Sequence, residues 1–218
     1  MEFTIDLIAE RSVLRESIKG IIWTIFFNRL FGPTIPSTNE FLSITYPLAT
    51  NLPDLEALID EKISVFIRTI IDKKPLPIKG IINIQFLTKS NSKRKSSGWF
   101  GRDYESDDSK IWETWIINIE CLPIKERTST TSTSTSTSTK PEYSQAVEIS
   151  LKSFENNLFK IYEFVDREKD HIPPITSLET SPFPYTINIM EFGKKLTPEK
   201  SNSDSDEGWG TYIKKILD

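Results

Sequence analysis

The sequence has one histidine, His171, and one cysteine, Cys121. A structural zinc site needs about four Cys or His ligands, so this chain cannot assemble the usual kind from its own residues. The same shortage excludes a disulfide framework, which fits a reducing compartment, and leaves little for a Cys–His or Ser–His–Asp nucleophile. We expect Cys121 to be a buried, unreactive thiol because it lies in an apolar strand pattern. We expect His171, which closes a helical pattern just before Pro173, to interact with the helix dipole.

Glycine is also scarce. The sequence has 8 glycines, and none falls in the GxGxxG, GxxxxGK or GxSxG patterns that bind dinucleotides, bind phosphates or present a nucleophilic serine. Carboxylates are plentiful, but Glu105, Asp107 and Asp108 read as a solvated loop face rather than as a paired acid and base. We therefore expect no metal, no cofactor and no enzymatic activity.

Long hydrophobic runs are missing as well. The most apolar run, Ile18–Phe31, is interrupted by Lys19, Asn28 and Arg29 and falls short of the roughly 20 apolar residues that span a bilayer. Acidic residues near the amino terminus disfavour a signal peptide. The net charge of −4, from 27 basic and 31 acidic residues, provides no general attraction for nucleic acid or anionic membranes. We expect a soluble, intracellular protein.

Strand and helix patterns alternate along the rest of the chain. Alternating apolar residues predict strands at Phe3–Ile8, Gly80–Leu87, Ile111–Cys121 and Phe183–Phe192. Helical spacing predicts a helix over Val13–Leu30 capped by Ser12, a second over Pro53–Ile71, and a third that begins at Pro141-Glu142 and has its apolar stripe over Val147–Val165. This order predicts an α+β fold, a single domain over residues 1–218 with three main helices packed on a largely antiparallel sheet.

Two segments do not follow these patterns, and the assignment of a third is open. Residues 32–53 contain four prolines, so we expect mostly irregular structure with a short extended piece at Leu42–Tyr46. Residues 127–140 form a Ser/Thr-rich insertion without apolar residues to bury, and we expect it to be disordered. It is either a phosphoacceptor cluster or a neutral expansion, and we favour the second. A closing helix over Trp209–Leu217 is predicted, with a strand as the open alternative.

The most unusual stretch is the polar loop at residues 90–110, between two predicted strands. Its centre is Trp99-Phe100, flanked by Gly98 and Gly101. Each aromatic ring carries roughly 150–250 Å² of surface that is normally buried. The pair either folds back onto its own domain or is covered by a partner. Because three helices and four strands already supply the core with apolar faces, we favour a protruding finger whose aromatic pair is an interaction hot spot.

Basic residues beside this aromatic pair raise two further possibilities. Lys93–Lys95 could grip single-stranded nucleic acid together with the rings, or could meet anionic lipid headgroups while Trp99 enters the interface. The acidic run Glu105–Asp108 on the same loop opposes both, and three cations are too few for tight nucleic-acid binding. We expect no nucleic-acid partner and keep peripheral membrane binding as the alternative function.

Several of these features together resemble the autophagy-related protein 101 family. The most specific is the Trp99-Phe100 tip followed by a strand that opens with Trp112-Glu113-Thr114-Trp115. The two amino-terminal helices agree, as does the stretch from Ile172-Pro173-Pro174 to Phe183-Pro184-Tyr185. The resemblance covers nearly the whole chain.

The resemblance implies a HORMA-like domain that acts as a non-enzymatic scaffold in autophagy initiation. Such a domain pairs with the HORMA domain of autophagy-related protein 13 as a heterodimer and stabilises it. Trp99 and Phe100 would then be the WF finger that recruits downstream factors, with only indirect membrane contact, in the cytoplasm at the phagophore assembly site. This chain differs from many relatives in two ways: no proline separates the two finger residues, and the chain contains the Ser/Thr insertion.

Overall fold

The computed structural model describes residues 1–88, 109–124, 144–175 and 182–193. The strands are β1 (Glu2–Glu10), β2 (Pro36–Phe41), β3 (Ile44–Ala49), β4 (Ile78–Leu87), β5 (Ile111–Leu122) and β6 (Tyr185–Glu191). The helices are α1 (Leu14–Arg29), α2 (Pro53–Phe66), which continues into a π-helical turn η1 (Ile67–Ile71), and α3 (Gln145–Arg167). The predicted α+β class with three main helices is confirmed.

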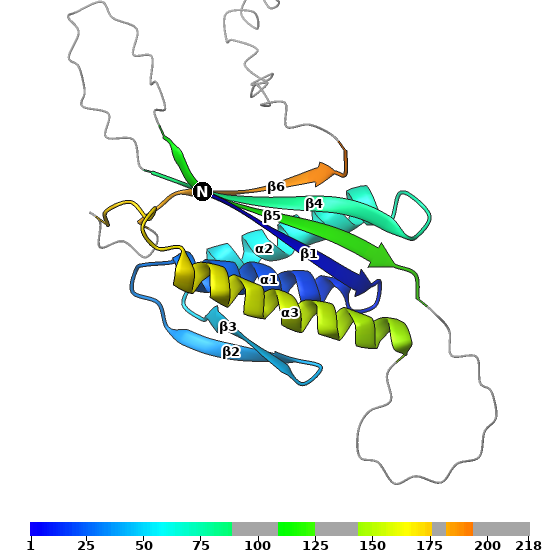
Figure 1. Ribbon diagram of the computed structural model, residues 1–218. Helices are drawn as coiled ribbons and strands as arrows, with labels where there is room; N and C mark the ends of the chain where they lie inside the picture. The colour runs from blue at the N-terminus through cyan, green and yellow to red at the C-terminus, as the bar shows by residue number, and fades with distance from the viewer. Residues whose placement is uncertain (89–108, 125–143, 176–181, 194–218) are drawn as a thin grey trace, which may run out of the picture.

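A four-stranded sheet in the order β1-β5-β4-β6 forms one layer, and the helices lie on one of its faces (Figure 1). Strand β4 pairs antiparallel with both β5 and β6, whereas β1 runs parallel to β5, with Ile5 opposite Ile117. The sheet is therefore mixed, and the prediction of a largely antiparallel sheet missed the parallel pair. Local sequence carries no signal for it, because the paired strands are joined by a long connection rather than by a short turn.

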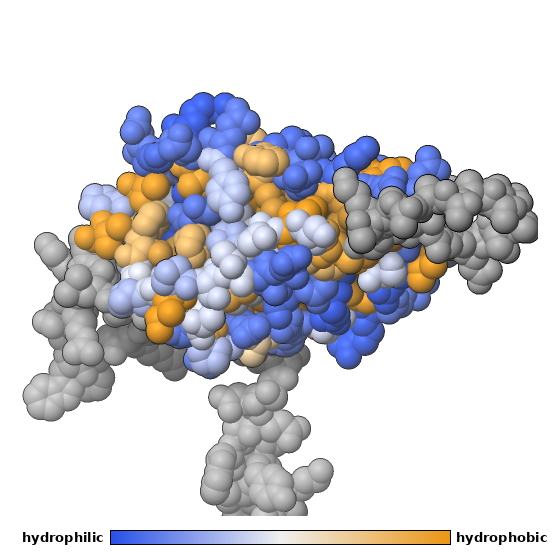
Figure 2. Space-filling model, turned by 90° about the horizontal axis from the view of Figure 1, so that it is seen from below, coloured by the Kyte–Doolittle hydropathy of each residue, from blue (hydrophilic) through white to orange (hydrophobic). Residues whose placement is uncertain are grey.

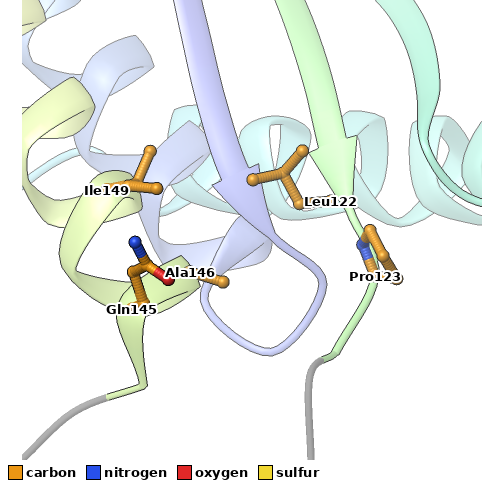
Figure 3. A pocket seen from close by; sticks show the side chains of 5 residues that line it. All are labelled: Leu122, Pro123, Gln145, Ala146 and Ile149. Atoms are coloured by element: carbon orange, nitrogen blue, oxygen red, sulfur yellow. The ribbon is translucent and has the colours of Figure 1, made fainter.

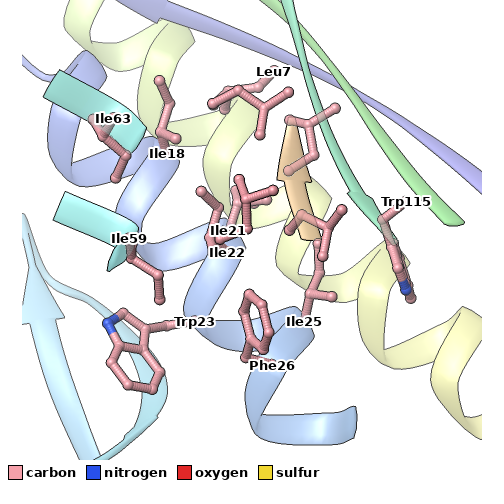
Figure 4. Close-up of a cluster of buried hydrophobic side chains, with 14 of the residues drawn as sticks. Leu7, Ile18, Ile21, Ile22, Trp23, Ile25, Phe26, Ile59, Ile63 and Trp115 are labelled. Atoms are coloured by element: carbon pink, nitrogen blue, oxygen red, sulfur yellow. The ribbon is translucent and has the colours of Figure 1, made fainter. Parts of the chain in front are cut away.

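Helix α1 lies in the centre of the core and is buried on nearly every side. It packs against β3, α2 and α3 as well as the sheet. Figure 4 shows its residues between side chains of β1, α2 and β5; Ile18, Ile21 and Phe26 have no exposed surface. A helix in this position is apolar around most of its circumference, which explains the broad apolar face in the sequence.

The β2–β3 hairpin contradicts the prediction that residues 32–53 are mostly irregular. Its two strands pair antiparallel from Pro36 opposite Ala49 to Phe41 opposite Ile44. The turn residues Leu42 and Ser43 both have positive φ, 48° and 71°, as a two-residue type I′ turn requires. Such a turn usually has Asn or Gly, and neither residue occurs at Leu42 or Ser43 to indicate it. Prolines are tolerated because every strand of a two-stranded sheet has a free edge.

The helix ends differ in part from the predictions. Val13, not Ser12, occupies the N-cap position of α1, without a side-chain cap. Ser12 instead donates its hydroxyl to Glu10 Oε1 at 2.7 Å. Helix α3 starts at Gln145, and Ser144 caps it by accepting a hydrogen bond from the Val147 amide. Pro53 opens α2 as predicted, and that helix reaches Ile71 with a π-helical last turn.

The outer edge of β1 is covered by side chains of α3. Ser153 Oγ accepts from the Ile8 amide at 2.9 Å, and Ser150 Oγ accepts from the Glu10 amide at 2.8 Å. One turn further along, Asn157 Nδ2 donates to the Asp6 carbonyl at 2.8 Å. Unpaired edge groups invite association with another strand, so this row of polar side chains closes that edge.

Several predictions concern residues outside the described ranges. These are the Ser/Thr insertion at 127–140, the closing segment Trp209–Leu217 and most of the 90–110 loop. The extent of a single domain over residues 1–218 depends partly on them. All of these stay predictions.

Gly20 of α1 marks a close approach of three elements. A Cβ there would lie 2.6 Å from the buried ring of Phe154 in α3 and 3.1 Å from the ring of Tyr46 in β3. Replacing glycine by alanine inside a helix ordinarily stabilises by about 1 kcal/mol. We expect Gly20→Ala to destabilise by about 1–3 kcal/mol instead, because the added methyl overpacks the core. Urea unfolding measures this, and adding Phe154→Leu should make the combined loss less than additive. A stabilised Gly20→Ala chain would contradict this packing.

Candidate functional site

Trp99 and Phe100, the predicted finger residues, lie outside the described residues, and so does the basic cluster Lys93–Lys95. What the structure describes is the base from which this loop leaves the sheet. The Thr88 amide donates to the Lys110 carbonyl at 2.9 Å, and the Lys110 amide donates to Thr88 Oγ1 at 3.2 Å. The two ends of the loop are thus held side by side at the end of the β4–β5 pair. The role of Trp99 and Phe100 stays a prediction.

A register irregularity lies next to this base. Phe86 faces Glu113, but Leu87 faces Ile111, so Trp112 is an extra residue in β5. A bulge of this kind redirects side chains that would otherwise alternate between the two faces of the sheet. As a result, Trp112 and Glu113 are both buried, although they are consecutive in the strand.

The buried carboxylate of Glu113 joins three parts of the fold. Arg29 Nε, from the last turn of α1, donates to both of its oxygens, at 2.8 and 2.9 Å. Trp115 Nε1, from β5 itself, donates to Oε1 at 2.5 Å. His171 Nε2, from the segment that follows α3, lies 2.7 Å from Oε2, and it donates because an ionised carboxylate only accepts. We call these four residues the Glu113 cluster.

The Glu113 cluster is shielded from solvent but not fully hydrogen-bonded. The side chains of Arg29 and Glu113 are 1% and 0% exposed. Rings of Phe3 and Trp112 lie 6.0 and 5.7 Å from the ring of His171, centre to centre. Three buried nitrogens at the cluster, Arg29 Nη2, Trp112 Nε1 and His171 Nδ1, have no hydrogen-bond partner among the described residues. Such atoms lower stability, because their desolvation is not compensated.

The structure corrects the prediction for His171. Helix α3 ends at Arg167, so His171 lies beyond the helix and contacts Glu113 rather than the helix dipole. Sequence reasoning missed Arg29 and Glu113 too, because each looked like an ordinary polar residue and its partner is 84 positions away. Trp112 and Trp115 are both buried in the core. Cys121 is buried, as predicted, and burial raises the pKa of its thiol to about 11.

Helix α3 carries the most exposed large aromatic residue of the described chain. Its inner side packs through Phe154, Leu158 and Ile161, which are at most 5% exposed. On its outer side Phe159 is 65% exposed and Tyr162 is 41% exposed, three residues apart and therefore neighbours on the helix surface. We call this pair the α3 aromatic ridge. On the face opposite the sheet, hydrophobic residues form patches separated by hydrophilic ones (Figure 2).

Two shallow hollows lie in the described part of the surface. One of about 210 Å³ lies between the end of β5 and the start of α3, lined mainly by Leu122, Pro123, Ala146 and Ile149 (Figure 3). Another of about 320 Å³ lies between β1 and α3. Ligand pockets usually measure about 300–1,000 Å³ and are well enclosed. Neither hollow contains a histidine or cysteine, and only Asp6 in the second is acidic.

Two features are absent from the described residues. No group of three or more His, Cys, Asp or Glu side chains that could hold a metal ion occurs there. None of the described helices is both long enough and apolar enough to cross a bilayer. The expectations of no metal and no cofactor stay predictions for the whole chain.

Comparison with known proteins gave consistent matches. The family model described as "Autophagy-related protein 101" matches residues 6–179. A relative named "Autophagy-related protein 101" from Arabidopsis thaliana is 30% identical over 219 residues, covering 97% of this chain and 92% of the relative. A relative of the same name from Schizosaccharomyces pombe is 25% identical over 215 residues, covering 98% and 93%.

Loss of the buried Arg29–Glu113 pair should lower the stability of the chain much more than loss of a partly exposed ion pair. We expect Arg29→Met to destabilise by about 3–5 kcal/mol, because it leaves a buried carboxylate without its cation. As a control, Arg11→Met removes a pair with Asp72 in which both side chains are partly exposed, and it should cost no more than about 1 kcal/mol. Urea unfolding of both variants checks this. Equal losses in the two would show that the Arg29 pair is not isolated from solvent.

Proposed function

The chain belongs to the autophagy-related protein 101 family, and on that basis we propose that it is a non-enzymatic scaffold of autophagy initiation. It pairs with and stabilises the HORMA domain of autophagy-related protein 13, and it recruits downstream factors through Trp99 and Phe100. The family name supports an autophagy-related role and names no reaction. We further propose that the domain itself is HORMA-like and acts in the cytoplasm at the phagophore assembly site.

The observation that carries the pairing proposal is the α3 aromatic ridge. Phe159 is more exposed than any other large hydrophobic residue of the described chain. The core does not need it, because Phe154 and Ile161 already fill the inner side of the same helix. Exposed aromatic residues that a partner desolvates contribute disproportionately to binding. We therefore assign the partner's docking surface to the outer side of α3.

Charged side chains near the α3 aromatic ridge are suited to form the polar rim of a protein–protein interface. Glu163 is exposed and pairs with Arg167 at 3.2 Å, one helical turn from the ridge. Lys169 pairs with Asp166 at 2.6 Å on the same surface. Both signs of charge thus flank the apolar pair on its carboxyl-terminal side, as expected of the polar rim of a protein–protein interface. A partner that binds only the folded chain also raises its apparent stability, and the effect grows with partner concentration.

The recruitment proposal is supported by the base of the loop. Hydrogen bonds between Thr88 and Lys110 hold both ends of the loop at the end of the β4–β5 pair. A two-point attachment restricts the space that the aromatic pair can sample, which lowers the entropy lost when a partner orders it. The base lies on the sheet and the ridge lies on α3, so one chain can serve two partners.

Replacing the finger residues tests recruitment. We expect Trp99→Ala with Phe100→Ala to keep the thermal unfolding temperature and the binding of the autophagy-related protein 13 HORMA domain, because in our proposal neither side chain is part of the core. Recruitment of downstream factors in cells that lack the endogenous chain should be lost. A double variant that unfolds would show that the rings are core residues. If the double variant loses binding to anionic liposomes but still recruits downstream factors, the result would favour peripheral membrane binding as the function of the two rings.

Replacing the ridge tests pairing. We expect Phe159→Ser to weaken binding of the autophagy-related protein 13 HORMA domain by at least about 30-fold, since an aromatic hot spot contributes roughly 2 kcal/mol or more. Phe192→Ser is the matched control, because Phe192 is 57% exposed but lies beyond β6. Isothermal titration calorimetry measures both. Equal affinities for Phe159→Ser and the control would place the partner elsewhere.

A further inference from the structure

The Glu113 cluster lies at the base of the 90–110 loop, which we call the aromatic loop because it carries Trp99 and Phe100. The cluster has no role in the function proposed above. Glu113 is three residues after Lys110, where the loop rejoins the sheet. Its carboxylate is held by α1 through Arg29, by β5 through Trp115 and by the segment after α3 through His171. Three elements that are distant in sequence are therefore fixed at one point beside the loop.

Stability alone does not explain this cluster. Replacing a buried ion pair by apolar residues of similar volume is often neutral or stabilising, because burying two charges is expensive. Here the burial is nearly complete, and three nitrogens at the cluster have no partner among the described residues. A core built only for stability would use apolar side chains at Arg29 and Glu113. Directional hydrogen bonds instead define a geometry that apolar packing leaves free.

The geometry in question is that of the β5 bulge. Trp112 is the extra residue, and the next side chain, Glu113, is turned into the core. Two contacts from Arg29 Nε hold that side chain, which fixes the backbone on the carboxyl side of the bulge. On the amino side, the register of Ile111 with Leu87 leads directly to the Thr88–Lys110 hydrogen bonds. The direction in which the chain enters and leaves the loop thus depends on the bulge.

We propose that Glu113 is a positioning residue for the aromatic loop: by fixing the bulge, its cluster sets the orientation of the loop base, and the contact with His171 ties that base to the segment after α3. The link to recruitment rests on the proposed function of Trp99 and Phe100. The link to the loop base does not, and the two can be tested separately.

The test separates positioning from stability with a double variant. Arg29→Met with Glu113→Gln removes both charges and keeps one oxygen as an acceptor for Trp115; the new amide nitrogen faces His171, which can accept from it in its other tautomer. We expect the double variant to be more stable than Arg29→Met alone, because no unpaired charge remains buried. The bulge, however, loses the bifurcated hydrogen bond from Arg29 Nε that holds Glu113. The Arg11→Met, Asp72→Asn double variant is the matched control for removal of an ion pair.

The direct readout is amide hydrogen exchange of Thr88, measured by NMR. We expect Thr88 to exchange at least about tenfold faster in the Arg29→Met, Glu113→Gln chain than in the unmodified chain, while the amide of Ile82 in the middle of β4 changes by less than about twofold. Recruitment in cells should fall with it, although pairing with autophagy-related protein 13 is retained. Unchanged exchange at Thr88 in a folded double variant would overturn the proposal.

Two further measurements keep the test decisive. If the double variant does not fold, His171→Gln is used in its place. The His171 side chain is 17% exposed, and its replacement leaves the Arg29–Glu113 pair intact. Thr88 should then exchange at least about threefold faster, and an unchanged rate would overturn the proposal. If Thr88 exchange rises as expected but the Trp99→Ala, Phe100→Ala chain still recruits normally, positioning of the loop base stands and the recruitment function is wrong.

Discussion

Helix α1 is buried between the sheet and the other helices, and the elements around it take their positions from their contacts with it. Residues such as Ile18, Ile21 and Phe26 fill the space under β1 and β5 completely. At Gly20 the helix comes so close to Phe154 and Tyr46 that no side chain fits. Because this core is closed, large apolar groups on the outside are not needed to complete it. The α3 aromatic ridge is such a group, and in our account the finger pair is another.

Polar groups are used where the fold needs direction rather than volume. Side chains of α3 cover the outer edge of β1 and fix the position of the helix along that strand. The Glu113 cluster does the same for α1, β5 and the segment after α3. Each arrangement costs desolvation energy, and each defines one geometry among the many that apolar packing allows. Both surfaces that we assign to partners are therefore carried by elements whose positions are fixed by hydrogen bonds.

Much of the fold could be predicted from periodicity, because α3 and the strands of the main sheet show their patterns within a single element. The β2–β3 hairpin could not, since Leu42 and Ser43 take positive φ without the usual turn residues. The parallel pairing of β1 with β5 depends on residues more than 100 positions apart. The Glu113 cluster shares this difficulty: a glutamate in a strand and a lone histidine after a helix give no sign that they meet. The exposure of Phe159 could not be predicted either, because which side of a helix stays uncovered depends on the assembled fold.

We propose that one chain offers two separate surfaces, the α3 aromatic ridge to the HORMA domain of autophagy-related protein 13 and the loop to a recruited factor. Hydrogen exchange with mass spectrometry, comparing the free chain with its complex with that HORMA domain, tests this most directly. We expect slower exchange in peptides that cover Glu155–Glu163 and no change at Thr88 or Lys110. Slower exchange at the base of the loop, with α3 unchanged, would contradict it.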